Sequence, residues 1–164
     1  MAPVAITAFT ATTALGAGLD AQASALRERR SGMRRNDFGP QPLECWIGRV
    51  AGVEDVVLPD ALQGWDCRNN QLAWLALQQD GMAAAVQAAA QRYGAERVAV
   101  VMGTSTSSVG ASEEAYTRLV EDAHGLRFPD DLQRPIVHTP HSLGDFVQHA
   151  TGLRGPAITV ATAC

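Results

Sequence analysis

Apolar residues along the chain occur in two patterns, short continuous runs and longer stretches with helical spacing. Short runs rich in valine, isoleucine and alanine are typical of buried strands. Longer stretches that end at glycine are typical of helices. The predicted strands are Val4–Phe9, Arg97–Met102 and Ala157–Ala161. The first predicted helix is Asp20–Arg30, with Asp20 as its N-cap, and a long core helix is predicted from Asp66 to Gly94. Two more helices are predicted, one that begins at Ser112-Glu113-Glu114 and stops at Gly125, and one over Ser142–Thr151.

This order of elements predicts an α/β fold with a mostly parallel sheet, because strands alternate with helices. The run Arg97–Met102 is apolar throughout rather than alternating, so we expect a strand that is covered on both faces. Residues 36–64 hold scattered prolines and glycines and short β-like pieces, which indicates an irregular surface segment.

Composition and charge exclude several classes of protein. The 164 residues, 46% hydrophobic and 18% charged, fit one globular domain, and the net charge of −4 argues against a nucleic-acid binder. The segment Pro3–Leu19 lacks the basic and apolar regions of a signal peptide. No apolar stretch reaches the length of about 18 residues that a membrane span needs, so we expect a cytoplasmic protein without a membrane span.

The position of Cys164 suggests chemistry. It follows the predicted strand Ala157–Ala161, and reactive groups often lie just past the carboxyl ends of sheet strands. A small buried cysteine would look the same at this position. The other cysteines, Cys45 and Cys67, are too far apart in sequence to indicate a disulfide framework or a zinc site.

Five stretches of the chain resemble β-ketoacyl-acyl-carrier-protein synthases, and they occur in the order found in that family. The run Gly152–Cys164, with its G-L-R-G-P segment and terminal T-A-C, closely resembles the strand and nucleophile turn of these enzymes. The other stretches are Val4-Ala5-Ile6-Thr7 with Leu15-Gly16, Arg30-Ser31-Gly32-Met33, and Val98–Thr104, and Pro140-His141-Ser142 stands in the place of the family's P-N-S turn, with histidine where asparagine is usual.

The resemblance implies the fold, the reaction and the partners. The expected fold is the thiolase-like, layered α-β-α-β-α fold, of which residues 1–164 would form the N-terminal half of the synthase domain. The expected enzyme is an acyltransferase: Cys164 takes an acyl group from a carrier protein, and decarboxylation of malonyl-carrier-protein gives the carbanion that attacks it. Two histidines and a lysine that assist lie downstream in the family, so residues 1–164 alone are expected to be inactive. No cofactor is expected beyond the phosphopantetheine of the acyl carrier protein.

Two further sites are expected from the same resemblance. Thr104, Ser105 and Thr106 stand where the family has its Gly-Thr-Gly loop beside the acyl tunnel and the dimer interface. Here Ser105 replaces the second glycine and Thr106 an apolar residue, which favours a stiffer or more polar chain, such as a polyketide or aryl-polyene intermediate, over a plain fatty acid. The strand Ile158-Thr159-Val160 is expected to pair across a homodimer, or a heterodimer with a chain-length-factor-like subunit.

Competing interpretations remain open at this stage. A chain-length factor has the same fold, although its cysteine is usually replaced, and a non-enzymatic α/β binding module would make the T-A-C accidental. His138 and His141 form an H-x-x-H, but no carboxylate supports a metal site, so no metal is expected. The arginines of the first helix and the loop after it form either a solvated face or a docking surface for an acidic carrier protein; they are Arg27, Arg29, Arg30, Arg34 and Arg35.

Overall fold

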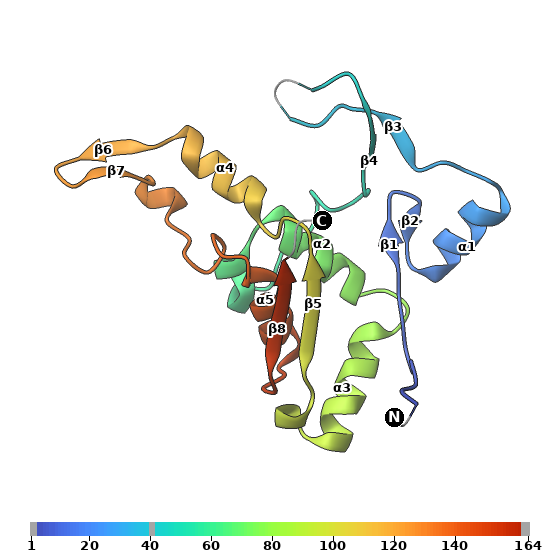
Figure 1. Cartoon of the computed structure of the whole chain (residues 1–164). Helices are drawn as coiled ribbons and strands as arrows, with labels where there is room; N and C mark the ends of the chain where they lie inside the picture. Colours follow the sequence, from blue (N-terminus) through green and yellow to red (C-terminus); the bar gives the residue numbers. More distant parts are fainter. Residues whose placement is uncertain (1–2, 40–41, 162–164) are drawn as a thin grey trace.

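A computed structural model of the chain describes residues 3–39 and 42–161 (Figure 1). At its centre two strands, β5 (Val100–Thr104) and β8 (Ala157–Ala161), run parallel, with Val100 opposite Ala157 and Thr104 opposite Ala161. Parallel strands need a long crossover, and here it contains two helices, α4 (Val109–Thr117) and α5 (Ser142–Thr151). The α/β class with a parallel sheet, predicted from the sequence, is confirmed.

One face of this sheet carries the core. Helix α5 lies across it and buries Phe146 completely, together with Leu143 and Val147, against Val100 of β5. The contact is close because α5 presents Gly144 to β8: a Cβ atom at this position would overlap Oγ1 of Thr159. Three leucines from flanking segments complete this buried cluster, namely Leu58, Leu62 and Leu153.

The opposite face of the sheet is open in the described residues. Successive side chains of a strand point to opposite faces, so Val101, Ile158 and Val160 share the face turned away from α5. Their exposed fractions are 66%, 53% and 46%. The predicted strand Arg97–Met102 is confirmed, with its bounds shifted to Val100–Thr104. The described residues cover only one of its faces, so cover on both faces in the whole fold stays a prediction. The strand Ala157–Ala161 has its predicted bounds but is likewise not buried.

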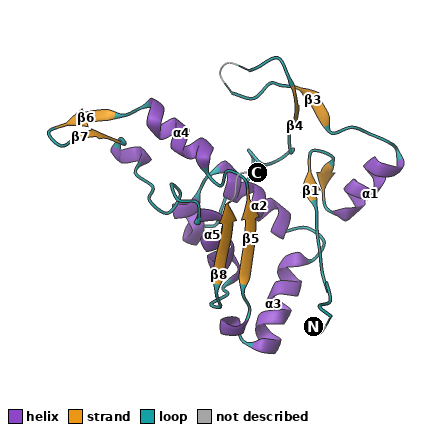
Figure 2. Ribbon diagram, in the orientation of Figure 1, coloured by secondary structure: helices purple, strands orange, loops and turns teal. Residues whose placement is uncertain are grey.

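The helices before β5 differ from the single helix that the sequence predicts between Asp66 and Gly94. The chain forms α2 (Arg68–Leu77) and α3 (Met82–Tyr93), which are separated by a turn in which Asp80 and Gly81 have φ of 53° and 72°. A left-handed backbone cannot continue an α-helix, so the prediction of one core helix is wrong, although the stop at Gly94 is confirmed. Figure 2 shows the break as a loop between the two helices.

The turn between α2 and α3 also holds the first helix, α1 (Leu19–Arg27). The carboxylate of Asp80 accepts hydrogen bonds from the backbone N–H of Leu19, at 3.0 and 3.2 Å, and from the hydroxyl of Thr10 at 2.7 Å. The N-cap residue of α1 is Gly18, not Asp20 as predicted, and it supplies no side-chain cap. Asp80 therefore caps α1 from a distant part of the chain.

The predicted strand Val4–Phe9 is wrong as a strand. Val4, Ile6 and Phe9 are exposed, and the segment pairs with no strand in the described residues. A ladder needs strands about 4.8 Å apart. Here an open cavity of about 310 Å³, lined by Thr7 and Ala8 on one side and by α3 and β5 on the other, separates this segment from the sheet.

The helix predicted between Ser112 and Gly125 is also wrong in its bounds. Helix α4 begins at Val109 and ends at Thr117, and a hairpin follows in which Gly125, with φ of 110°, opens the second strand. Figure 1 shows α4 and this hairpin reaching away from the sheet. By contrast, α5 has its predicted bounds, and its C-cap residue is Gly152, whose φ is 67°.

The remaining elements are short. None of the helices in residues 3–39 and 42–161 has the length and apolar character needed to cross a bilayer. The short strands are β1 (Thr12–Thr13), β2 (Gly16–Ala17), β3 (Met33–Arg35), β4 (Trp46–Gly48), β6 (Val120–Asp122) and β7 (Gly125–Arg127), and the 3-10 turns are Asp60–Trp65, Ala95–Arg97 and Asp130–Leu132.

Candidate functional site

The carboxyl ends of β5 and β8 meet at a cavity of about 290 Å³. Because Thr104 is paired with Ala161, both parallel strands end at the same edge of the sheet, where the loop after β5 begins. Open α/β sheets place their ligands in such crevices. The cavity is lined by Ser105, Thr106, Ser107, Ser108, Val109, Ser112, His138, Thr139, Pro140 and Ala161.

Hydrogen bonds fix the loop after β5 against the segment that precedes α5. The backbone N–H of Ser107 donates to Oγ1 of Thr104 at 2.8 Å, and the Ser107 hydroxyl donates to the Thr139 carbonyl at 3.5 Å. The Ser108 hydroxyl donates to the carbonyl of Val137. Ser107 has φ of 49°, in the left-handed region, so the loop is held in a conformation that serine seldom adopts.

A serine–histidine pair lines the same cavity. Oγ of Ser112 lies 3.0 Å from Nδ1 of His138, and Nε2 of His138 lies 2.7 Å from the carbonyl oxygen of Leu132. The histidine ring also packs against Phe128, with ring centroids 5.1 Å apart and the planes tilted by 57°. The His138 ring is therefore held on three sides, by a hydroxyl, a carbonyl and an aromatic face.

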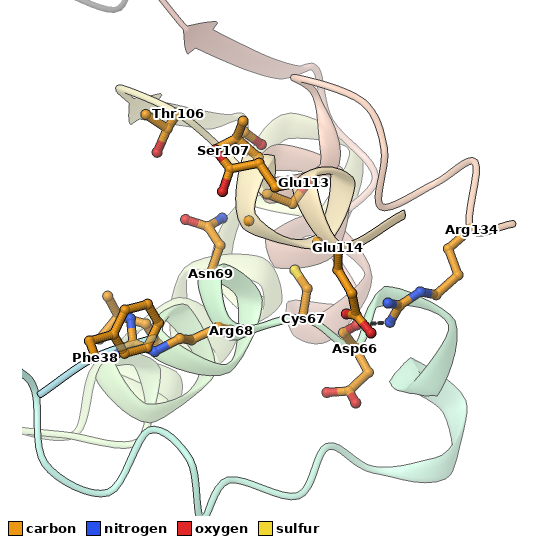
Figure 3. Close-up of a pocket in the computed structure, with 15 residues that line it drawn as sticks. Phe38, Asp66, Cys67, Arg68, Asn69, Thr106, Ser107, Glu113, Glu114 and Arg134 are labelled. Carbon is orange, nitrogen blue, oxygen red and sulfur yellow. Dashed lines mark hydrogen bonds between the residues drawn. The ribbon is translucent and has the colours of Figure 1, made fainter. Parts of the chain in front are cut away.

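A second, larger cavity of about 620 Å³ shares residues 106–109 of the loop (Figure 3). Helices α2 and α4 both begin at its wall, and Arg134 reaches across to donate from its Nη1 to the Asp66 carbonyl at 3.0 Å. Cys67 lies buried in the wall, and this burial raises the pKa of its thiol. A thiol with a raised pKa is a poor nucleophile at neutral pH, so Cys67 is a structural cysteine.

The predicted site residues have different outcomes. Cys164 lies outside the described residues; the last described residue of β8, Ala161, is three positions before it and lines the smaller cavity. Ser105 and Thr106 also line this cavity, whereas Thr104 ends β5 and holds the loop through Ser107. On the predicted dimer strand, Ile158 and Val160 lie on the open face of the sheet, while Thr159 faces α5.

The pairing of Ser112 with His138 was not expected from the sequence. Its H-x-x-H pattern joined His138 to His141, but in the structure His141 precedes α5 as its N-cap residue and only His138 lines the cavity. No group of three or more histidine, cysteine or carboxylate side chains gathers within the described part of the chain. Ser112 and His138 are 26 residues apart, so no local motif could have paired them.

The basic cluster of α1 and the segment after it lies on the surface. Its arginines are exposed. Arg30 pairs with Glu28 at 3.3 Å, and Arg34 pairs with Asp37; both pairs are solvent-exposed. Exposed pairs of this kind contribute little to stability, because water and salt screen them.

No protein-family model and no curated protein sequence matches the chain. Among solved structures, it is similar to a chain of the complex between the ketosynthase ApeO and its chain length factor ApeC from Xenorhabdus doucetiae, with 28% sequence identity and a TM-score of 0.68. The similarity covers 92% of this chain and 37% of that chain, so the present chain spans little more than a third of its length. The fold expected from the resemblance is therefore confirmed: the described residues have a ketosynthase-like, thiolase-like α/β fold.

Proposed function

We propose that this chain is the N-terminal half of a β-ketoacyl-acyl-carrier-protein synthase and that Cys164 is its nucleophile. The observation that carries the proposal is the alignment of β5 and β8, whose carboxyl ends bring residues 105–108 and Ala161, three positions before Cys164, to one cavity. The similarity to a ketosynthase complex over 92% of the chain supports it.

The proposed reaction has two steps. First, the Cys164 thiolate attacks the thioester carbonyl of an acyl-carrier-protein, so that an acyl–cysteine bond forms and the carrier thiol leaves. Then malonyl-carrier-protein loses carbon dioxide, and the resulting carbanion attacks the acyl–cysteine carbonyl, which releases the thiolate and forms the β-ketoacyl product. The histidines and lysine that assist in the family are proposed to lie outside this chain.

We propose that the described residues orient the acyl chain for this reaction. The loop after β5 is anchored at both sides, through Thr104 within the loop and through the carbonyls of Val137 and Thr139. A rigid wall beside the nucleophile orients the acyl chain and lowers the entropy cost of reaching the transition state. Ser105 and Thr106 are proposed to contact that chain.

A second candidate is a chain-length-factor-like subunit, because the similar structure is a complex that contains both kinds of protein. The cysteine at position 164 favours the catalytic subunit, since chain length factors usually lack it. In either case we propose a dimer formed along Ile158-Thr159-Val160. The described residues pair β8 with β5 alone, which leaves the other edge of β8 unpaired within them. An uncharged strand edge of this kind needs cover.

The function is tested with the complete protein that contains this chain, supplied with acyl- and malonyl-carrier-protein. We expect Cys164→Ala to reduce condensation to background, because no acyl–enzyme can form, while Cys45→Ala, which removes an exposed thiol, retains the wild-type rate. Condensation by Cys164→Ala at an undiminished rate would refute the proposed function. Condensation by neither protein, together with restored activity on adding a separate synthase subunit, would identify a chain length factor.

The dimer is tested by sedimentation of the same protein, alone and with its partner subunit. Thr159→Pro removes a backbone donor of β8 and should weaken association and activity together, whereas Thr159→Ser keeps the donor and should leave both intact. A fully active monomer at assay concentration would exclude the proposed interface.

A further inference from the structure

The direction of the hydrogen bonds in the Ser112–His138 pair can be assigned. A carbonyl oxygen can only accept a hydrogen bond, so the contact of 2.7 Å between Nε2 of His138 and the Leu132 carbonyl places a proton on Nε2. In the neutral ring Nδ1 is then a bare acceptor, and the hydroxyl of Ser112, 3.0 Å away, donates to it. Both hydrogens of the pair are therefore donated to protein atoms, one to the Leu132 carbonyl and one to Nδ1 of His138.

The other serines of the cavity follow the same rule. Ser107 and Ser108 donate their hydroxyl hydrogens to the carbonyls of Thr139 and Val137. Three serine oxygens in the wall, those of Ser107, Ser108 and Ser112, thus have their hydrogens committed to the protein and keep lone pairs that can accept. A saturated hydrocarbon chain offers these oxygens nothing, and burying them without a donor costs free energy.

From this arrangement we infer that the Ser112–His138 pair selects an acyl chain that carries a hydroxyl group at the depth of this cavity. The inference rests on the proposed function, because it assumes that the acyl chain of Cys164 enters the cavity. The incoming hydroxyl donates to the Ser112 oxygen. His138 strengthens that oxygen as an acceptor, since its Nδ1 draws the serine hydrogen away and polarises the O–H bond.

Packing keeps the pair in place for this role. The His138 ring packs at a tilt against Phe128, which in turn meets Tyr116 edge to face with centroids 5.0 Å apart. Helix α4 supplies both Ser112 and Tyr116, so the aromatic contacts hold the histidine against the same helix that carries its serine. The pair is therefore a preorganised element, and it needs no rearrangement to accept a hydroxyl.

The test measures acylation of Cys164 in the complete protein by intact mass. The probes are synthetic thioesters in matched pairs of increasing chain length, one of each pair ending in a hydroxyl and the other in a methyl group of similar size. We expect the hydroxyl chain to acylate faster at one chain length, by about tenfold in kcat/KM, the effect of one satisfied hydrogen bond.

Two variants and a control locate the preference. Ser112→Ala and His138→Phe should each bring the ratio of the two rates close to one, and the serine variant keeps the test valid if the phenylalanine disturbs packing against Phe128. His124→Phe, at an exposed position in the β6–β7 turn, should keep the wild-type ratio.

The possible failures are distinct. Equal acylation by both probes at every length, or a preference that survives Ser112→Ala, would overturn this inference and leave the proposed function standing. The absence of any acylation at Cys164 would overturn both.

Discussion

The two faces of the β5–β8 sheet have similar residues but opposite surroundings. On one face Val100 is 6% exposed beneath α5, while on the other face its neighbour Val101 is 66% exposed. The open face also presents Ile158 and Val160, both apolar. Side chains of this kind seldom form a contiguous exposed patch on a protein surface. We infer that the open face is covered in the complete protein, as a layered α/β fold requires.

The largest effect is expected on the covered face. Phe146 is fully buried, so Phe146→Ala should lower the free energy of unfolding of the complete protein by about 3–5 kcal/mol. Chemical denaturation monitored by circular dichroism measures this change. Tyr93→Ala, at a half-exposed position in α3, is the control and should cost far less. A small effect of Phe146→Ala would show that α5 is not part of the core.

The open face gives the next largest effect. If the remaining chain covers it, Ile158→Ala should cost about 2–4 kcal/mol in the complete protein, as for a buried isoleucine, although Ile158 is 53% exposed here. The same denaturation experiment applies. A cost below about 0.5 kcal/mol, the usual range for surface positions, would mean that this face stays open to solvent.

The contact between α5 and β8 comes third. Gly144→Ala places a Cβ against Thr159 Oγ1 and should destabilise the complete protein by about 1–3 kcal/mol, because helix and strand must move apart. Gly110→Ala in α4 is the matched control: its Cβ meets nothing within 4 Å, so the change should be neutral or stabilising. Adding Thr159→Ala to Gly144→Ala should recover part of the loss, and a strictly additive double variant would argue against the contact.

The smallest effect lies in the N-terminal region. Asp80→Ala removes the cap of α1 and should cost about 1 kcal/mol, since it leaves the Leu19 N–H without its carboxylate partner. Hydrogen exchange at the first turn of α1 measures this directly, with Asp20→Ala as the control. Equal protection of Leu19 in Asp80→Ala and wild type would contradict the capping.

Elements with strong local signals could be predicted from the sequence, whereas elements that depend on tertiary contacts could not. The bounds of α5 and β8 could be predicted because local signals coincide there: helical spacing closed by Gly152, then an apolar run. Val4–Phe9 could not, since its apolar pattern is that of a strand and only the absence of a paired neighbour in the described residues decides otherwise. The break at Asp80 depends on a backbone conformation and a tertiary cap that no local pattern encodes.

The candidate site shows the same limit. The terminal T-A-C and the Gly103-Thr104 pair indicate the end of the sheet at which chemistry is expected, because one follows an apolar run in the sequence and the other closes one. The pairing of Ser112 with His138 depends instead on how the segment between α4 and α5 folds back on the loop, which is a long-range property.

The central claim, that Cys164 is the activated thiol of this chain, is tested most directly by labelling the complete protein with cerulenin and mapping the modified cysteines. Cys45 is an exposed thiol, and Cys67 is buried with its pKa raised by that burial, so neither has a reason to react selectively. We expect modification at Cys164 at a rate at least about tenfold higher than at Cys45, and no modification at Cys67. Labelling of Cys45 as fast as Cys164, or no labelling of Cys164, would contradict it.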